Sequence, residues 1–370
     1  MKLKAKEFKD CIKTILQAID TKEPSMFTET LELITKNKEL FLNVTNREYY
    51  VSVKFDLEQD EKFHASVNAR VFLNLISQVT TDYIEMTVEN NNIRVLANGE
   101  YKLPIIYNGA SMLELPKIEV NNITNEMNIN SDILLSILNY NSKELQVGIP
   151  VKPVQKYYYI DEHGAITFTS GACINNFDLE KPIKMLLNEK VVKLFKLFKD
   201  TDKVEFKMGQ EDIGNNIIQT RVLFRSSNIE LTAKLQDSGL VSSVPVQAIR
   251  TMGTKAYPYS ILIARSNIIQ AINRLSLFND GGLYGFFEFT NDTVTIYNYN
   301  KDNKEVVKLE NKLENFEYKF ILDLNNLKLI LDTCSEEYLT ITFGDQRAVV
   351  INRNNIINII PELKIGGGNE

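Results

Sequence analysis

Apolar residues recur at intervals of three and four positions in several separate segments of the chain. Such spacing places the side chains on one face of a helix. In the first segment these residues are Phe8, Ile12, Ile15, Leu16 and Ile19. The same pattern predicts helices that contain residues 133–138 and 268–275. After each helix, apolar and polar residues alternate and predict half-buried strands. The connecting turns are expected near Asn37, Gly164 and Asn291, almost evenly spaced along the chain.

A second set of amphipathic helices is predicted at 68–79, 188–198 and 324–331, each introduced by an Asn or Asp that can cap it. Strands at 84–96, 204–233 and 339–351 follow them, and the middle group is interrupted by a polar insert at 210–219. The order helix, strands, helix, strands therefore occurs three times. It predicts an α+β fold of three tandem domains, each with two helices packed on an antiparallel sheet. The expected domains are 1–123, 124–250 and 251–370, with a linker at 251–258.

Length and composition agree with a multi-domain globular protein. The chain has 370 residues, of which 44% are hydrophobic and 24% charged. Its three cysteines lie far apart and lack metal-ligand spacing, so neither a disulfide framework nor a zinc site is indicated. No apolar run is as long as a membrane span, and no leader pattern opens the chain. We therefore expect a cytoplasmic protein without membrane contact.

Motifs of enzymatic chemistry are missing from the sequence. We find no Walker loop, HExxH, GxSxG or dinucleotide-binding fingerprint, and His64 and His163 are the only histidines. Cys173 belongs to no Cys/His signature, so it is interpreted as a small buried thiol. The prediction is a protein without catalytic residues, metal or cofactor. Two alternatives remain. The protein could be an enzyme, which a measured turnover would support. It could also be a modular β-rich structural or interaction protein whose binding does not depend on DNA topology.

Several segments together resemble one family. They are YKFILDLNNL at 318–327, LTITFGD at 339–345, IIPELKI at 359–365, SVNARVFLNLI at 66–76, NGEYKLP at 98–104, KPVQKY at 152–157 and FTSGACI at 168–174. In order and spacing they resemble the β subunit of bacterial DNA polymerase III, the β sliding clamp, from a bacterium or a phage. The resemblance covers nearly the whole chain, and the middle third is the most divergent part.

The resemblance implies a head-to-tail homodimer that closes a six-domain ring, with helices lining the hole and sheets outside. Such a protein is a processivity factor of DNA replication. Its expected partners are double-stranded DNA without sequence preference, the replicative DNA polymerase, a clamp loader and clamp-binding peptides of other replication and repair proteins.

The formal net charge of −6 requires that any DNA-facing surface be locally basic. Basic residues on the faces opposite the apolar stripes of four predicted helices are the candidates: Lys6, Lys9, Lys13, Arg70, Lys190, Lys193, Lys196 and Arg274. A lysine face on a single helix is more often only a solvated face.

The resemblance also implies an apolar cleft for partner peptides and a dimer seam. The cleft residues would be Val154, Thr169, Gly171, Ala172, Cys173, Ile174, Val349, Ile359, Ile360 and Pro361. Two departures from the family, Ala172-Cys173 and Glu362, predict an altered peptide preference, with Glu362 disfavouring an acidic neighbour of the anchor. Ile359 and Ile360 could equally be an ordinary last strand. The seam would place Leu277 and Phe278 of one subunit against Tyr101 and Leu103 of the other.

Overall fold

The structure is a computed structural model that describes residues 1–147, 149–214, 217–278, 284–314 and 316–364. The chain forms two compact units. Unit 1 combines Met1–Leu135 with Lys190–Asp237, and unit 2 combines Ser136–Glu189 with Ser238–Glu370. The second of the three repeats therefore contributes to both units. The domain boundaries expected from the sequence remain a prediction.

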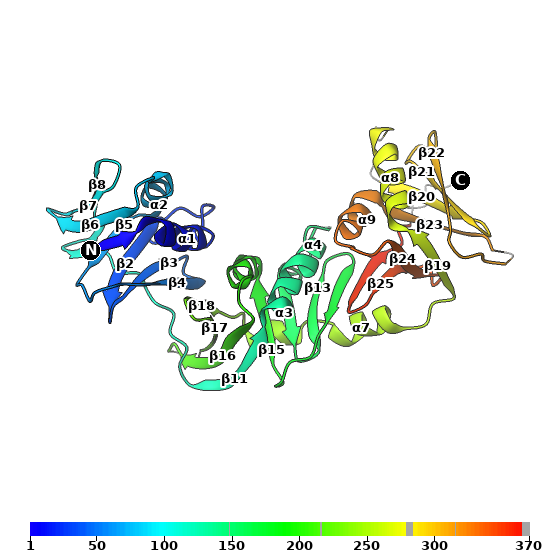
Figure 1. Cartoon of the computed structure of the whole chain (residues 1–370). Coiled ribbons are helices and arrows are strands. Elements are labelled where there is room, and N and C mark those ends of the chain that lie inside the picture. Colours follow the sequence, from blue (N-terminus) through cyan, green and yellow to red (C-terminus); the bar gives the residue numbers. More distant parts are fainter. Residues whose placement is uncertain (148, 215–216, 279–283, 315, 365–370) are drawn as a thin grey trace. The chain divides into compact units, whose positions relative to one another are not determined.

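Each repeat follows the order strand, helix, four strands, helix, three strands (Figure 1). The first repeat consists of β1 Lys2–Lys4, α1 Ala5–Leu16, β2 Thr30–Lys36, β3 Glu39–Thr45, β4 Tyr49–Asp56, β5 His64–Asn68, α2 Ala69–Gln78, β6 Tyr83–Glu89, β7 Asn92–Leu96 and β8 Glu100–Pro104. Two short strands follow, β9 Tyr107–Asn108 and β10 Ser111–Met112.

The second repeat begins with β11 and a helix that contains a π-helical segment. Its elements are β11 Ile123–Asn130, α3 Ser131–Ser136, η1 Ile137–Asn141, α4 Ser142–Glu144, η2 Pro153–Lys156, β12 Tyr157–Asp161, β13 Gly164–Phe168, β14 Ala172–Asn176, β15 Lys184–Asn188, α5 Glu189–Val192, η3 Lys193–Phe198, β16 Lys203–Asp212, β17 Ile218–Arg225 and β18 Ile229–Lys234.

The third repeat is preceded by two short helices. The elements are α6 Ser238–Ser242, α7 Val246–Thr254, β19 Tyr259–Ala264, α8 Arg265–Leu275, η4 Ser276–Phe278, β20 Tyr284–Phe289, β21 Thr293–Tyr297, β22 Lys304–Lys308, β23 Tyr318–Asp323, α9 Leu324–Leu331, β24 Tyr338–Phe343, β25 Ala348–Arg353 and β26 Ile356–Pro361. None of the described helices is both long and apolar enough to cross a membrane.

Unit 1 contains an eight-stranded antiparallel sheet in the order β11-β16-β17-β18-β4-β3-β2-β5 and a four-stranded sheet in the order β1-β6-β7-β8. Helices α1 and α2 pack beside each other (Figure 1) and meet through Phe8 and Phe72, whose ring centroids are 6.5 Å apart. Phe8, Ile12 and Ile15 are buried as expected. Leu16 is 46% exposed because the helix ends there, so the apolar face is shorter than the sequence suggested.

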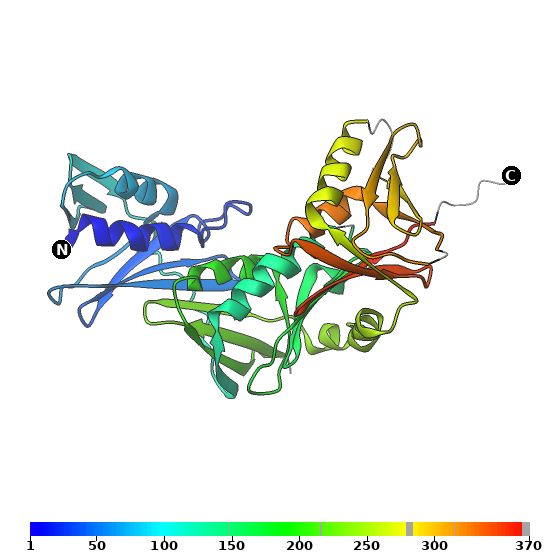
Figure 2. The ribbon, with the colours of Figure 1, turned by 45° about the vertical axis from the view of Figure 1, so that its right-hand side comes forward.

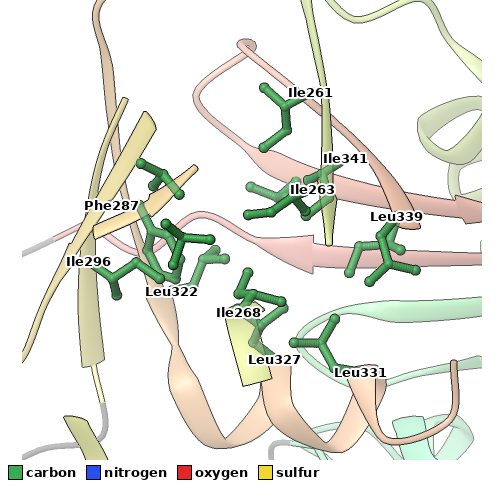
Figure 3. Packing of buried hydrophobic residues seen from close by; sticks show 14 of the residues in the cluster. Ile261, Ile263, Ile268, Phe287, Ile296, Leu322, Leu327, Leu331, Leu339 and Ile341 are labelled. Atoms are coloured by element: carbon green, nitrogen blue, oxygen red, sulfur yellow. The ribbon is translucent and has the colours of Figure 1, made fainter. Parts of the chain in front are cut away.

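Unit 2 contains a second eight-stranded sheet, β15-β12-β13-β14-β26-β25-β24-β19, and a four-stranded sheet, β22-β21-β20-β23. The third-repeat core lies between these strands and helices α8 and α9. Figure 3 shows Ile268 and Leu327 from the helices near Phe287 and Leu322 from the strands. Burial of these apolar faces fixes both helices on the sheet.

The structure confirms the expected α+β class with antiparallel sheets and two predicted helix caps. The Asn68 side chain accepts a hydrogen bond from Val71 N at 3.0 Å, and Asp323 Oδ1 accepts from Asn325 N and Asn326 N at 2.9 and 3.0 Å. Two predictions were wrong. Helix α7 extends into the linker expected at 251–258. The insert expected at 210–219 is strand at both ends, because β16 continues to Asp212 and β17 begins at Ile218, and residues 215–216 lie outside the described residues.

Candidate partner-peptide site and basic surface

The two predicted walls of the peptide cleft meet inside unit 2, because β14 and β26 are hydrogen-bonded neighbours in one sheet. Ala172 lies opposite Ile359, and Ile174 lies opposite Ile357. On this face of the sheet, Val154, Ala172, Ile174 and Ile359 belong to one buried apolar cluster. Helix α7 covers this cluster (Figure 2) through Ile249, which the sequence did not suggest as part of the site.

Three predicted cleft residues, Cys173, Val349 and Ile360, lie on the other face of the sheet, because successive side chains of a strand point to opposite faces. Val349 and Ile360 lie in the third-repeat core and are 1% and 2% exposed. Cys173 is fully buried beside Asn358 on the opposite strand, and burial raises the pKa of its thiol. These side chains support the sheet from the other side and have no surface for a ligand.

A tight turn at Gly171 precedes β14 and is half-buried next to β26. The Thr169 amide donates to the Gly171 carbonyl oxygen at 3.0 Å. A side chain at position 171 would collide with the Ile359 carbonyl oxygen and would lie 3.3 Å from Pro361. Only glycine allows this close approach of two backbones. Gly171 and Pro361 are therefore the predicted residues of this turn that remain partly accessible.

A buried carboxyl group lies under the same turn. Glu144 is 1% exposed, and its Oε1 lies 3.1 Å from the Thr169 hydroxyl oxygen. Burial raises the pKa of Glu144 to about 8. The Thr169 hydroxyl also donates to the Val147 carbonyl oxygen. Since a hydroxyl has one hydrogen, a protonated Glu144 can donate to Thr169 while Thr169 donates to Val147.

Gln155 fixes the segment that precedes β12. Its side-chain Nε2 donates to the Thr169 carbonyl oxygen at 2.8 Å, and its Oε1 accepts from the amides of Val151 and Lys152, each at 2.8 Å. The side chain is buried, so these bonds replace its contacts with water. Gln155 therefore ties Val154 to the Gly171 turn. Gln155 lies in the segment 152–157, which resembles the family, but the sequence gave no sign of this role.

The accessible layer over the apolar cluster comes from residues that sequence reasoning missed. Partly buried apolar side chains pack against it from β12, β13 and the α6–α7 segment: Tyr157, Phe168, Leu240, Val241, Val246, Met252 and Tyr257. Their mixture of aromatic and flexible aliphatic groups suits contact with an apolar anchor. The sequence signal that could have found them is the amphipathic spacing of Val246, Ile249 and Gly253 on α7.

The basic residues expected to face DNA are distributed over both units. Seven of them, Lys6, Lys9, Lys13, Arg70, Lys190, Lys193 and Lys196, belong to unit 1, and Arg274 belongs to unit 2. Lys6, Arg70 and Lys193 are exposed, and Lys196 is partly exposed. Each lies on the polar face of its helix, as the periodicity predicted.

At least four of these basic groups already have partners within the chain. Lys9 donates to the Val79 carbonyl oxygen, and Lys13 pairs with Asp10 at 3.0 Å. Lys190 lies 3.1 Å from Asp20 and 3.0 Å from Glu23. Arg274 makes two bonds to Glu305, at 2.7 and 2.8 Å. The positive charges of Lys13, Lys190 and Arg274 are partly neutralised by these carboxylates, so Arg70 and Lys6 are better placed to attract a phosphate.

The predicted seam residues lie beside two sheet edges. Leu277 and Phe278 follow α8 and are 79% and 51% exposed. The neighbouring edge strand of the unit 2 four-stranded sheet is β22, with Val306 59% exposed. In unit 1, Tyr101 is exposed on the edge strand β8, whereas Leu103 is buried. Among the described residues no group of three or more His, Cys, Asp or Glu could hold a metal ion.

No family model and no curated protein matches the sequence. Solved structures, in contrast, match over the whole length. A sliding clamp, DNA polymerase III subunit beta, from Pseudomonas aeruginosa bound to griselimycin has a TM-score of 0.83 at 13% identity and covers 99% of each chain. A DNA polymerase III beta chain from Streptococcus pneumoniae has a TM-score of 0.80 at 15% identity, covering 98% of this chain and 99% of that one.

A third match is the Helicobacter pylori beta clamp bound to a DNA ligase peptide, with a TM-score of 0.78 at 13% identity. It covers 98% of this chain and 99% of that chain. The threefold repeat and its agreement with full-length structures define the class of the protein as a three-repeat clamp fold. The particular fold is that of the bacterial DNA polymerase III beta sliding clamp.

Proposed function

We propose that the protein is a DNA sliding clamp, in which two copies close a ring around duplex DNA and tether a replicative polymerase. The observation that carries this proposal is the full-length agreement between the threefold repeat and the solved clamps. A ring holds DNA by enclosing it. Weak phosphate contacts then suffice, and a chain with a net charge of −6 can still stay on DNA.

Edge strands support the closure of the ring by a second copy. Strand β8 carries exposed Tyr101, and helix α8, which packs against β22, is followed by exposed Leu277 and Phe278. Exposed apolar groups next to an unpaired strand edge favour pairing with another chain. We therefore infer a homodimer in which β8 of one copy meets β22 of the next. Because β8 and β22 are different surfaces, the contact is head to tail.

The apolar cluster behind the Gly171 turn supports binding of partner peptides. Tyr157 and Met252 offer apolar contacts at its surface, and the H. pylori clamp of similar fold is bound to a DNA ligase peptide. A polymerase, a clamp loader and other replication or repair proteins would share this site in turn. Each would insert an aliphatic or aromatic anchor. We propose a cytoplasmic location on the same basis.

The decisive experiment compares retention on two forms of one DNA. After loading by a clamp loader, the protein should stay on a nicked circular duplex and leave the same duplex once a nuclease linearises it. Gel filtration of labelled protein with DNA measures this directly. Equal retention on both forms would instead favour the alternative, a β-rich interaction protein without DNA topology.

The peptide site has its own test, independent of DNA. Replacing Tyr157 and Met252 with alanine should weaken polymerase stimulation while the native mass stays that of a dimer. Ile360→Ala is a poor test of peptide binding, because Ile360 lies in the third-repeat core and its loss would leave a cavity. Unchanged stimulation by the Tyr157 and Met252 double variant would exclude this surface.

A further inference from the structure

A groove lies along strands β20 and β23 of the third-repeat sheet, and its lining residues come from both faces of that sheet. In Figure 3, Phe287 points into the core, so its strand neighbours Phe286 and Glu288 face the opposite side. The groove has a volume of about 720 Å³. Its apolar walls come from Phe286, Ile321 and Leu363. Two polar groups, Tyr318 and Glu362, also line it.

The backbone around Glu362 is held at both sides. The Glu362 amide donates to the Arg347 carbonyl oxygen at 2.9 Å, and the Leu363 amide donates to the Ile321 carbonyl oxygen at 2.9 Å. Two consecutive bonds, one to the turn before β25 and one to β23, leave little freedom in where this residue sits. The carboxyl group is therefore presented to the groove in a defined place, and it immediately follows Pro361 of the peptide site.

The Glu362 carboxyl group in the groove has one oxygen without a hydrogen-bond partner among the described residues. Glu362 is half-buried, and its Oε1 accepts no hydrogen bond from the described residues. The Tyr318 hydroxyl lies close enough to influence the Glu362 carboxyl but makes no well-oriented hydrogen bond. Burial and the nearby Asp345 raise the pKa of Glu362 to about 7. An unmatched, partly desolvated carboxyl group is costly unless a ligand satisfies it.

The other charged groups around the groove do not neutralise Glu362. On β20 and β23, Glu288 and Lys319 pair with each other at 3.2 Å. Lys301, from the loop before β22, stands over the Phe286 ring at 4.5 Å. Asp345 is bound by Lys255. Glu317 and Lys364 are exposed, and among the described residues no cation forms an ion pair with Glu362. A positive group from outside the chain is therefore the missing complement.

We propose that this groove binds an arginine side chain of a partner peptide, with Glu362 as its acceptor. This inference rests on the proposed peptide-binding function and specifies its chemistry. A guanidinium group carries five donors and can satisfy both the Glu362 carboxylate and the Tyr318 oxygen. A guanidinium group is also less strongly hydrated than an ammonium group. The apolar anchor of the same peptide would occupy the surface near Met252.

Matched peptides test the proposal. The probe is a fluorescein-labelled peptide, Ser-Leu-Phe-Xaa-Ser-Gly, in which Xaa is arginine, citrulline or glutamate. Citrulline keeps the shape of arginine without its charge. Fluorescence polarisation with the full-chain protein at pH 8 should show the arginine peptide binding about tenfold tighter than the citrulline peptide, with glutamate weakest. The preference should shrink below pH 7, where Glu362 becomes protonated.

Two variants distinguish the effect of the Glu362 carboxyl group from the effect of negative charge near the groove in general. In Glu362→Gln, the ratio of arginine to citrulline affinity should fall to about one, while citrulline binding is kept. In Glu317→Gln, which removes an exposed acid at the same groove, the ratio should stay near the parent value. Equal affinity of the two peptides for the parent protein, or an unchanged ratio in Glu362→Gln, would overturn the proposal.

Failure of the inference can be told apart from failure of the proposed function. If the peptides bind without charge preference, peptide recognition stands and the role of Glu362 is refuted. If no peptide binds, the inference is also overturned, and retention on circular DNA then decides independently whether the protein is a clamp. Thermal unfolding of both variants, compared with the parent, verifies that any loss of binding does not reflect a loss of fold.

Discussion

The Thr169 hydroxyl lies 3.1 Å from a carboxyl oxygen of Glu144, a residue that is 1% exposed to solvent. This pair lies under the Gly171 turn, so the surface proposed for peptide binding rests on a buried acid. The other carboxyl oxygen of Glu144 has no hydrogen-bond partner among the described residues. The arrangement is most favourable when the acid is protonated, because an ionised carboxylate would be buried without a counter-charge.

Stability should therefore depend on pH through Glu144. Its pKa is raised in the folded protein to about 8 from 4.5, so its contribution is fully present below pH 4.5 and is lost as pH rises through 8. Each pKa unit corresponds to about 1.4 kcal/mol. Glu144→Gln should melt at a higher temperature than the parent at pH 9, with a smaller difference at pH 6. Circular dichroism measures both, and exposed Glu180→Gln serves as the control.

The Gly171 turn should not tolerate a side chain. Gly171→Ala would push a methyl group into the Ile359 carbonyl oxygen and strain the pairing of β14 with β26. We expect a loss of about 1–3 kcal/mol in the free energy of unfolding together with weaker peptide binding. Gly99→Ala, where a methyl group meets only the Tyr101 side chain, is the control for stability. Equal stabilities of the two variants would show that the turn can relax.

These outcomes also indicate what the sequence could and could not predict. Periodicity predicted α1 and α8, and residue type predicted the caps Asn68 and Asp323, because these depend on local chemistry. The strand partner of β14 is distant in sequence. Which of Ala172 and Cys173 faces the apolar cluster depends on that pairing, and the sequence pattern alone could not decide it. The burial of Glu144 had no sequence signal, because a glutamate on a helix is ordinarily solvated.

The predicted seam can be broken by charge. Leu277→Asp combined with Phe278→Asp should convert the dimer to monomers, since truncating or charging a central apolar anchor typically costs about 2 kcal/mol or more. Sedimentation velocity gives the mass. Ile149→Asp with Val151→Asp introduces the same charge at two residues that are 85% and 82% exposed elsewhere in unit 2. A dimer that survives in the Leu277 and Phe278 variant would place the seam on another surface.

The basic helix faces should supply the salt-dependent part of DNA binding. Reversing Arg70, Lys193 and Lys196 to glutamate should weaken retention on DNA, and each lost phosphate contact should reduce the salt slope by about 0.9. A matched triple reversal of Lys36, Lys38 and Lys62, which are exposed near the β2–β3 hairpin, should leave the slope unchanged. If both triple variants behave alike, the effect is one of net charge alone.

Strand β14 belongs to the second repeat and pairs with β26 of the third, so a single repeat is not a complete folding unit. A chain cut after the second repeat would keep β14 but lose the strand that completes its hydrogen bonds. The exposed edge would then invite aggregation or exchange with another molecule. During evolution, a single repeat therefore cannot be gained or lost unless another segment covers the strand edge that is left unpaired. This gives a physical reason for inheriting the three repeats together.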